Sequence, residues 1–175
     1  NSINISRLIP QTFYYFNAYS QSSQKLPVIF SVPSGNFGNL TAGIFSKFMG
    51  LPVKKFVAST NLNDTVPRYM QTGMYTPKAS VETISNAMDV GNPSNMDRIF
   101  DIYNNDFCLI KNDIESYSFN DNQTKNHIID TMNKYNYILD PHCAVGSLGL
   151  EYFLKTNSCE NLGICLATAH PSKFS

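Results

Sequence analysis

The sequence lacks the features that mark several large classes of proteins. None of its apolar runs approaches the roughly 20 residues that a membrane-spanning helix needs, so we expect no membrane association. Its 13 basic residues balance its 13 acidic ones, which argues against a nucleic-acid-binding surface and against contact with acidic lipids. The three histidines lie far apart and the four cysteines form no C-x-x-C pair, so we expect no metal site either.

The ends of the sequence indicate whether the chain is part of a longer protein, and its cysteines indicate the redox environment. It begins at Asn1 and Ser2 without an initiator methionine or a signal peptide, and it ends directly after a motif-like segment. We therefore expect residues 1–175 to form a single domain within a longer polypeptide. The cysteines favour free thiols in a reducing cytoplasm over disulfides. They are Cys108, Cys143, Cys159 and Cys165.

Residues 26–49 have the order apolar strand, small polar loop and apolar helix. Gly35 and Gly38 allow positive φ and a close approach of the backbone to a ligand. The N–H groups of this loop and of the first helical turn would converge on one point and favour an anion, most simply a phosphate ester. The spacing matches neither G-x-G-x-x-G nor a Walker loop. A glycine turn that only reverses the chain is the alternative interpretation.

The order of the apolar segments indicates an α/β fold with a mainly parallel sheet. Residues 26–32 and 54–60 have the composition of buried strands, and the helix between them completes a βαβ unit. A last strand over 163–167 is followed by Thr168, which should therefore lie at the same sheet edge as the loop. The remaining expected elements are helices at 1–19, 65–70, 95–103, 124–135 and 141–153 and a short strand at 137–139.

Two of these helices carry specific burial predictions. The first is expected to bury an apolar face that includes Leu8 and Phe13. The helix that ends at residue 135 is expected to bury Ile128, Ile129 and Met132. Residues 104–123 show too little periodicity for any element to be assigned.

Several polar residues have both a structural and a functional interpretation. Asp140 resembles the N-cap of a helix that starts at Pro141, and His142 beside it either faces a cleft or packs inside the fold. The Thr168 hydroxyl either binds a ligand or caps its loop. Residues 83–93 are rich in side-chain donors, which fits an ordered segment over a site or a plain surface loop.

The stretch from Ser34 to Gly43 resembles the corresponding stretch of threonine synthases. These are pyridoxal-phosphate (PLP) enzymes of fold type II that convert O-phosphohomoserine and water to threonine and phosphate. The resemblance covers nearly the whole chain and implies a three-layer αβα fold, the carboxyl-side half of the PLP-binding large domain. Other segments similar to family motifs occur in family order, at 1–7, 61–68, 86–90, 140–142 and 168–174.

The resemblance also implies a role for individual residues. Thr168 would hydrogen-bond the pyridine nitrogen of PLP, and residues 86–89 would lie near the active site. The family often has Asp where Asn39 stands here. The 5′-phosphate of PLP would be bound by Ser34, Gly35, Asn36, Phe37, Gly38 and Asn39. The substrate would be held by Asn1, Ser2, Asn4 and Arg7.

A lysine is the one group that the resemblance requires and the sequence does not provide. PLP chemistry needs a lysine that forms a Schiff base, and in the family it lies upstream, in a Phe-Lys-Asp-type segment. No lysine of this sequence has that context, so we expect no catalytic residue here. The chain alone should be inactive and should depend on the remainder of the same polypeptide. A piece of another fold-type-II PLP lyase, or a non-catalytic phosphate- or cofactor-binding module, are the alternatives.

Overall fold

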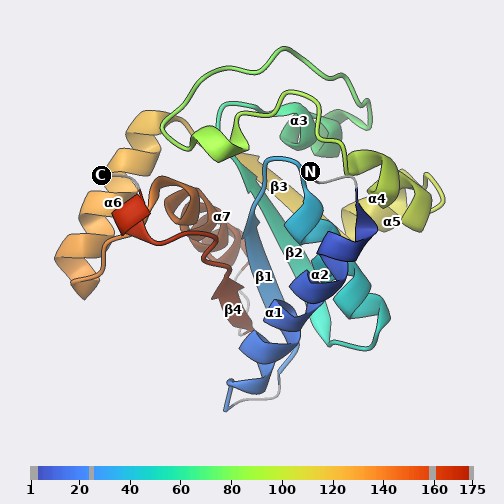
Figure 1. Cartoon of the computed structure of the whole chain (residues 1–175), viewed down its shortest axis with the longest axis horizontal. Helices are drawn as coiled ribbons and strands as arrows, with labels where there is room; N and C mark the ends of the chain where they lie inside the picture. The colour runs from blue at the N-terminus through green and yellow to red at the C-terminus, as the bar shows by residue number, and fades with distance from the viewer. Residues whose placement is uncertain (1–3, 24–25, 158–160, 174–175) are drawn as a thin grey trace.

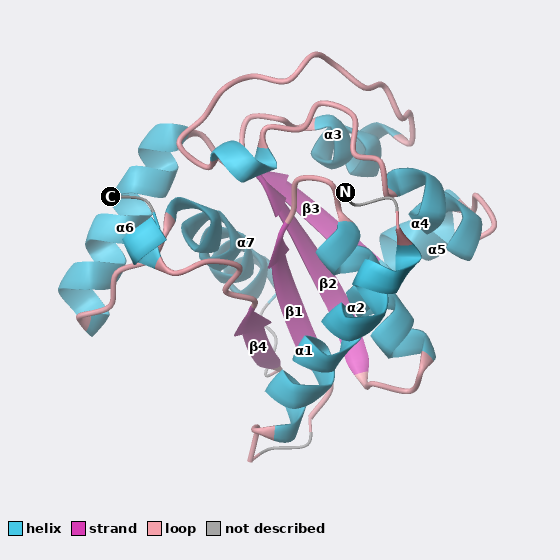
Figure 2. Cartoon of the chain, in the orientation of Figure 1, coloured by secondary structure: helices cyan, strands magenta, loops and turns pink. Residues whose placement is uncertain are grey.

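A four-stranded parallel sheet in the order β3-β2-β1-β4 forms the centre of the molecule (Figures 1 and 2). The computed structural model describes residues 4–23, 26–157 and 161–173. The α/β class with a parallel sheet is confirmed, and both strands of the expected βαβ unit are present. The strands are β1 (Val28–Pro33), β2 (Val53–Thr60), β3 (Ile114–Ser118) and β4 (Leu162–Cys165).

Strand β1 is buried along its whole length because both faces of the sheet are covered. Alternate side chains face opposite layers. Phe30 pairs in register with Phe56, and its ring lies 4.9 Å from that of Tyr15 in an edge-to-face contact. Val57, one residue along β2, points to the other face and packs against Phe153. This burial on both sides explains the uninterrupted apolar run in the sequence.

Helices lie on both faces of the sheet, so the fold has the three layers that the resemblance implied. Helices α1 and α2 cover one face, whereas α7 covers the other with α6 packed on its outside (Figure 1). Among the described helices, none is both long and apolar enough to cross a membrane. The helices are η1 (Ile5–Arg7), α1 (Leu8–Ser20), α2 (Gly38–Phe48), α3 (Thr65–Thr72), η2 (Asn86–Met88), α4 (Met96–Ile102), α5 (Phe107–Asp113), α6 (Asp121–Tyr135), α7 (Pro141–Asn157) and η3 (Pro171–Lys173).

Helix α1 buries only part of the face that was expected. Leu8, Thr12 and Tyr15 are buried, whereas Phe13 is 66% exposed. Tyr15 occupies the space above Gly43 of α2, where an added Cβ atom would lie 2.6 Å from the tyrosine ring. The expected burial of Leu8 is thus confirmed, but Tyr15 enters the core and Phe13 does not, because the close approach of two helices at a glycine selects which side chain is buried.

Three further differences from the sequence prediction lie in the second half of the chain. Residues 137–139 form an irregular connection between α6 and α7 and contain no strand. On α6, Ile128 is half-buried, whereas Ile129 and Met132 are 56% and 38% exposed, so most of the side expected to be buried faces outwards. The region 104–123, which showed no clear pattern, contains α5 and the edge strand β3.

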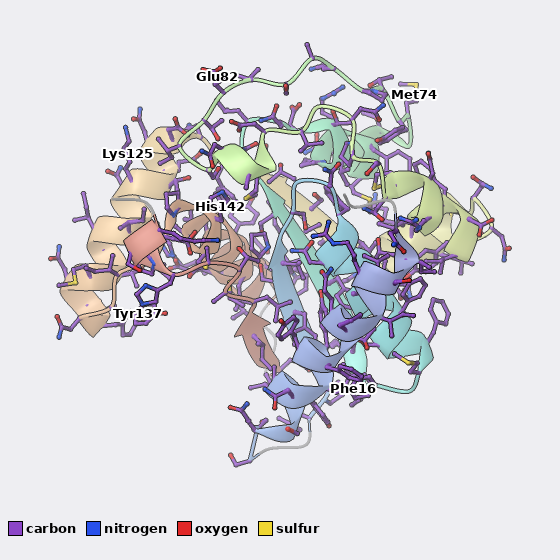
Figure 3. The ribbon with its side chains drawn as sticks, viewed as in Figure 1. Phe16, Met74, Glu82, Lys125, Tyr137 and His142 are labelled. Atoms are coloured by element: carbon purple, nitrogen blue, oxygen red, sulfur yellow. The ribbon has the colours of Figure 1, made fainter. Side chains whose placement is uncertain are left out.

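A long irregular connection between α3 and α4 passes over the carboxyl ends of the strands (Figure 1). Its part over the sheet, residues 83–90, includes η2 and is called the cover segment below. Met74 and Glu82, which precede it, point outwards from the molecule (Figure 3). The side chain of Asn61, at the end of β2, donates to Thr83 and Asp89 of the cover segment at 2.8 Å each. An ordered segment, not a plain surface loop, thus lies at this edge.

Candidate functional site

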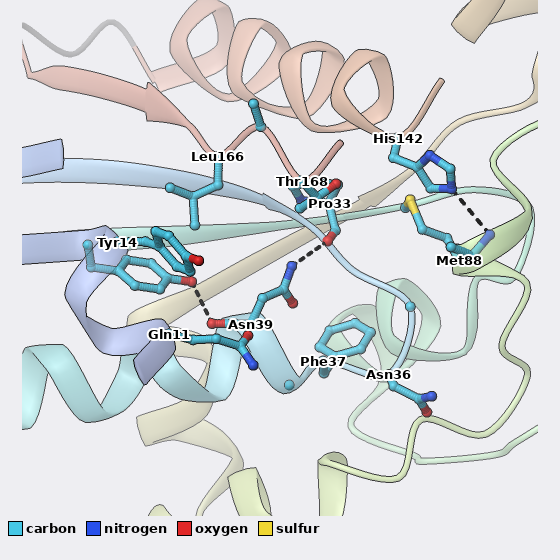
Figure 4. A pocket seen from close by; sticks show the side chains of 15 residues that line it. Gln11, Tyr14, Pro33, Asn36, Phe37, Asn39, Met88, His142, Leu166 and Thr168 are labelled. Carbon is cyan, nitrogen blue, oxygen red and sulfur yellow. Dashed lines mark hydrogen bonds between the residues drawn. The ribbon is translucent and has the colours of Figure 1, made fainter. Parts of the chain in front are cut away.

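A cavity of about 720 Å³ opens at the carboxyl ends of β1 and β4 (Figure 4). The loop between β1 and α2, residues 34–39, forms one wall and is called the glycine loop below. The cover segment and the start of α7 form a second wall, and the residues after β4 form a third. Helix α1 adds Gln11 and Tyr14 at the opening. Parallel sheets of this kind bind ligands at this edge.

The glycine loop leaves a row of backbone donors without protein partners. Within the described residues, the N–H groups of residues 35–39 have no hydrogen-bond acceptor. Ser34 differs, because its N–H donates to Ser59 O at 2.8 Å and its hydroxyl to Val32 O at 2.9 Å. Ser34 therefore supports the loop from beneath, while residues 35–39 line the cavity with free donors.

The turn in this loop is made by Phe37, not by the glycines. Phe37 has φ 61°, a left-handed conformation that costs a non-glycine residue roughly 1–3 kcal/mol. Gly35 and Gly38 are not among the glycines with positive φ, so that part of the prediction is wrong. Gly35 is needed for space, since an added Cβ would lie 2.8 Å from Ala87 O and 2.9 Å from Met88 Cα. The close approach at Gly35 is thus to the cover segment.

Asn95 fixes the orientation of the peptide between Asn36 and Phe37. Its backbone N–H and its Nδ2 donate to Asn36 O at 3.3 Å and 2.9 Å. Arg98 Nη1 donates to Asn95 Oδ1 at 2.6 Å and holds the fully buried amide in place. Because C=O and N–H of a trans peptide point in opposite directions, the Phe37 N–H is directed away from Asn95.

Asn39 ties the start of α2 to the end of β1 (Figure 4). Its Nδ2 donates to Pro33 O at 2.8 Å, a bond that an aspartate could not make. Its carbonyl oxygen accepts from the Tyr15 hydroxyl at 2.6 Å. Burial raises the pKa of Tyr15, so this hydroxyl stays a donor. The side chain at position 39 therefore has a structural task, and its backbone N–H is left for a ligand.

Thr168 lines the same cavity from the third wall. It is exposed, and its hydroxyl has no hydrogen bond to any other described residue. The structure thus brings together the two groups that the sequence placed at one sheet edge.

Of the four candidate substrate-binding residues, the two that the structure describes, Asn4 and Arg7, are not among those that line this cavity. Asn4 caps η1 by accepting from Ser6 N at 3.0 Å, and Arg7 precedes α1; neither lines the cavity. Asn1 and Ser2 lie outside the described residues.

Comparison with known proteins places this geometry in a family. No family model matches the chain. The threonine synthase of Haemophilus influenzae is 46% identical over 176 residues, which are 99% of this chain and 40% of that protein. The crystal structure of a PLP-bound threonine synthase from Brucella melitensis superposes with a TM-score of 0.92 at 32% identity. It covers 99% of this chain and 42% of its own. The Escherichia coli threonine synthase structure gives 0.89 at 42% identity over 99% and 40%.

The chain is a threonine synthase homologue. The similarity extends over almost all of it, and the fold-type-II architecture expected from the motifs is confirmed. The chain spans about 40% of the length of curated threonine synthases such as that of Haemophilus influenzae.

The cavity of this threonine synthase homologue is electrically neutral. Of the described residues that line it, none is a lysine, arginine, aspartate or glutamate. Cys143, behind the cavity wall, is buried, and desolvation raises the pKa of its thiol to about 11, so it is not an activated nucleophile. Across the described residues, no group of three or more His, Cys, Asp or Glu side chains is arranged to hold a metal ion.

The sequence analysis did not identify several of the lining residues. Gln11 and Tyr14 lie one to two helical turns beyond the polar cluster that was expected to face the site. Ala87 and Met88 come from the cover segment; the resemblance had implied that residues 86–89 lie near the active site, but it gave them no individual role. His142 lines the cavity and is also buried, so both interpretations left open for it hold (Figure 4).

Proposed function

We propose that this chain is the part of a threonine synthase that holds the phosphate and the pyridine ring of PLP. The whole enzyme would convert O-phosphohomoserine and water to L-threonine and phosphate, as a carbon–oxygen lyase acting on a phosphate ester. The observation that carries the proposal is the row of N–H groups at residues 35–39, for which no described residue is an acceptor. The 46% identity to a threonine synthase supports it over another lyase of the same fold or a non-catalytic module.

The glycine loop fits a phosphate in its chemistry. A phosphate has oxygens that each accept several hydrogen bonds, and the loop offers consecutive backbone donors at the N-terminus of α2. Helix N-termini favour anions because their N–H groups and dipole point at the ligand. Because the described residues of the cavity wall include no lysine or arginine, the binding energy would come from these neutral donors. Gly35, Asn36, Phe37, Gly38 and Asn39 would act through their N–H groups, and Ser34 by supporting them.

Thr168 would orient the pyridine ring. When bound, PLP supplies an electron sink for carbanion chemistry. A threonine hydroxyl can donate to the pyridine nitrogen, but it carries no charge to hold that nitrogen protonated. Reaction control would therefore depend on groups around the ring rather than on a full pyridinium charge.

Other parts of the enzyme would complete the site. The lysine that binds PLP covalently would lie on the remainder of the same polypeptide, so this chain alone would be inactive. We propose that residues 1–175 are a single domain, the carboxyl-side half of the PLP-binding large domain. Free thiols at the three described cysteines support a reducing, cytoplasmic location. The substrate contacts are proposed for Asn1, Ser2, Asn4 and Arg7.

The phosphate assignment can be tested by removing the phosphate from the ligand. In the full-length protein that contains this chain, we expect pyridoxal to bind at least about 100-fold more weakly than PLP, since several charge-assisted hydrogen bonds would be lost. Inorganic phosphate should compete with PLP. Both are measured by titration of cofactor absorbance and fluorescence. Equal affinities for pyridoxal and PLP would contradict the assignment.

The role of Thr168 predicts a functional defect without a folding defect. Thr168→Ala removes an exposed hydroxyl with no bond to the described residues, so the melting temperature should not change. Turnover of O-phosphohomoserine, measured as phosphate release, should fall about tenfold, as expected for one hydrogen bond to the cofactor. An unaltered rate would remove Thr168 from the site.

A further inference from the structure

The cover segment closes one side of the cavity by lying directly on the glycine loop. The space for a Cβ atom at Gly35 is taken by Ala87 O and Met88 Cα, at 2.8 Å and 2.9 Å. At its far end the segment is fixed by Asp89, whose Oδ2 accepts from Thr83 N at 3.0 Å. Ala87 and Met88 lie between Ser85 and Asp89, which are both bonded to Asn61, and a bond to Ala87 itself would add an anchor at the point nearest to Gly35.

His142 supplies that anchor from the first turn of α7. Its Nε2 accepts a hydrogen bond from the backbone N–H of Ala87 at 3.2 Å (Figure 4). The imidazole is 4% exposed and lines the cavity between α7 and the cover segment. One side chain therefore joins the helix to the segment exactly where the segment meets the glycine loop.

Asp140 sets the tautomer of His142. A backbone N–H can only donate, so Nε2 must carry the lone pair and a neutral imidazole must carry its proton on Nδ1. Nδ1 then donates to Asp140 Oδ1 at 3.0 Å. The same oxygen accepts from the N–H groups of His142 and Cys143 at 2.9 Å and 3.3 Å, as an N-cap carboxylate does. The capping carboxylate thus presents the acceptor nitrogen to the cover segment.

An aspartate–histidine pair beside a cavity also suggests a general base, but the geometry argues against this role. The lone pair of Nε2 is already engaged by Ala87, and freeing it would leave the Ala87 N–H without its acceptor. Among the described residues that line the cavity there is no serine, and Cys143 lies behind the wall with a thiol pKa raised by burial. The imidazole is therefore suited to holding a backbone, not to accepting a substrate proton.

We propose that His142 is a positioning residue for cofactor binding. By accepting from Ala87 N–H it keeps the cover segment against Gly35 and so keeps the phosphate-facing side of the glycine loop in shape. This inference rests on the proposed PLP site, because its functional consequence is cofactor affinity. The hydrogen bond itself is a property of the chain and can be measured without cofactor.

Two substitutions in the full-length protein separate the two bonds of His142. In His142→Gln, the amide oxygen can replace Nε2 as acceptor for Ala87, but nothing replaces Nδ1. In His142→Asn, the amide nitrogen can replace Nδ1 as donor to Asp140, but no acceptor reaches Ala87. We expect PLP affinity within about twofold of wild type for Gln and about five- to tenfold weaker for Asn, the worth of one neutral hydrogen bond. His127→Asn, on α6 and away from this cavity, should leave the affinity unchanged.

Amide hydrogen exchange gives a readout that does not involve the cofactor. Ala87 is an exposed residue, so protection of its N–H would come from the bond to His142. We expect protection in the wild-type apoprotein and in His142→Gln, and exchange about tenfold faster in His142→Asn. Fast exchange of Ala87 in the wild type would overturn the inference even if a variant failed to fold.

The affinities decide between this role and a purely structural one. If Asn kept wild-type affinity while Gln lost it, the bond to Asp140 would be the important one and the inference would be wrong. Equal losses in both variants, or no loss in either, would also overturn it. A wild-type protein that protects Ala87 but binds pyridoxal as well as PLP would refute the proposed phosphate site while leaving the anchor intact.

Discussion

The glycine loop and the cover segment lie against each other, yet they differ in whether their polar groups are hydrogen-bonded. In the loop, five consecutive residues, 35–39, keep backbone donors that no described residue accepts from. In the cover segment, Asp89 Oδ1 accepts from Thr83 Oγ1 and Asn61 Nδ2 at 2.8 Å each, and Oδ2 accepts from the Thr83 N–H. Unpaired donors favour a ligand, whereas paired ones favour rigidity. The glycine loop is therefore suited to binding a ligand, and the cover segment is suited to keeping the glycine loop in position.

Substitution at Gly35 should disturb this arrangement most strongly. In Gly35→Val, the branched side chain would collide with Ala87 O and Met88 Cα and push the cover segment away. We expect PLP binding to be lost and the free energy of unfolding to fall by about 2–4 kcal/mol, as for other overpacked sites. Titration with PLP and urea unfolding measure these effects.

Gly38→Ala is the matched control for Gly35→Val. An added Cβ at Gly38 has its nearest neighbours, Asn95 Nδ2 and Leu8 Cδ2, at 3.4 Å, which is ordinary contact. We expect this variant to bind PLP nearly as well as the wild type. Normal binding by Gly35→Val would show that the two segments need not touch.

Asn61→Leu should weaken the attachment of the cover segment without altering any residue of the glycine loop. The substitution leaves the Asp89 carboxylate and the Thr83 hydroxyl without their shared donor in a buried place. We expect a loss of about 2–4 kcal/mol in unfolding free energy and faster proteolysis of residues 83–90. In the control Asn92→Leu, an exposed amide that accepts only from Tyr75 in the described structure is removed, and the change should stay within about 0.5 kcal/mol.

Asn95→Asp should affect the glycine loop more than the fold, with the smallest effect on stability. It replaces the donor to Asn36 O by a carboxylate oxygen, while the contact with Arg98 is kept. We expect PLP affinity to fall about tenfold, because the Phe37 peptide would no longer be held in its left-handed turn. Ser94→Ala, which removes a side-chain bond of 3.3 Å to Asn36, should have little effect. Unchanged affinity in Asn95→Asp would mean that the loop keeps its shape without this support.

The elements that the sequence predicted are those whose local pattern and final environment agree. Strand β1 is apolar throughout because both its faces are covered, and the polar glycine loop follows at a sheet edge that parallel topology defines. Strand β3 was missed because only Ile114 and Ser116 of its five residues are buried, which leaves a short edge strand with little apolar signal. Ile129 was expected to be buried by its spacing, yet it is 56% exposed, since a periodic stripe does not say whether a partner covers it.

The sequence predicted which segments form the site, but it did not predict the backbone conformation of the loop or the contacts between the segments. The position of Thr168 beside the loop followed from strand order, because parallel strands end at one edge. The left-handed turn at Phe37 did not follow, since the neighbouring glycines are the residues that ordinarily take that conformation. Nor did the contact of His142 with Ala87, which joins residues 55 positions apart through a connection of irregular shape.

Phe37 couples the shape of a surface loop to the interior of the protein. Its ring is 1% exposed and belongs to the main hydrophobic core, while its backbone forms the bend between β1 and α2. The loop therefore cannot be exchanged as a short sequence motif. Residues 34–39 grafted onto another α/β scaffold would also need a buried apolar site for the Phe37 ring. Without that site, the backbone at this residue would adopt a right-handed conformation, and the geometry that binds an anion would be lost.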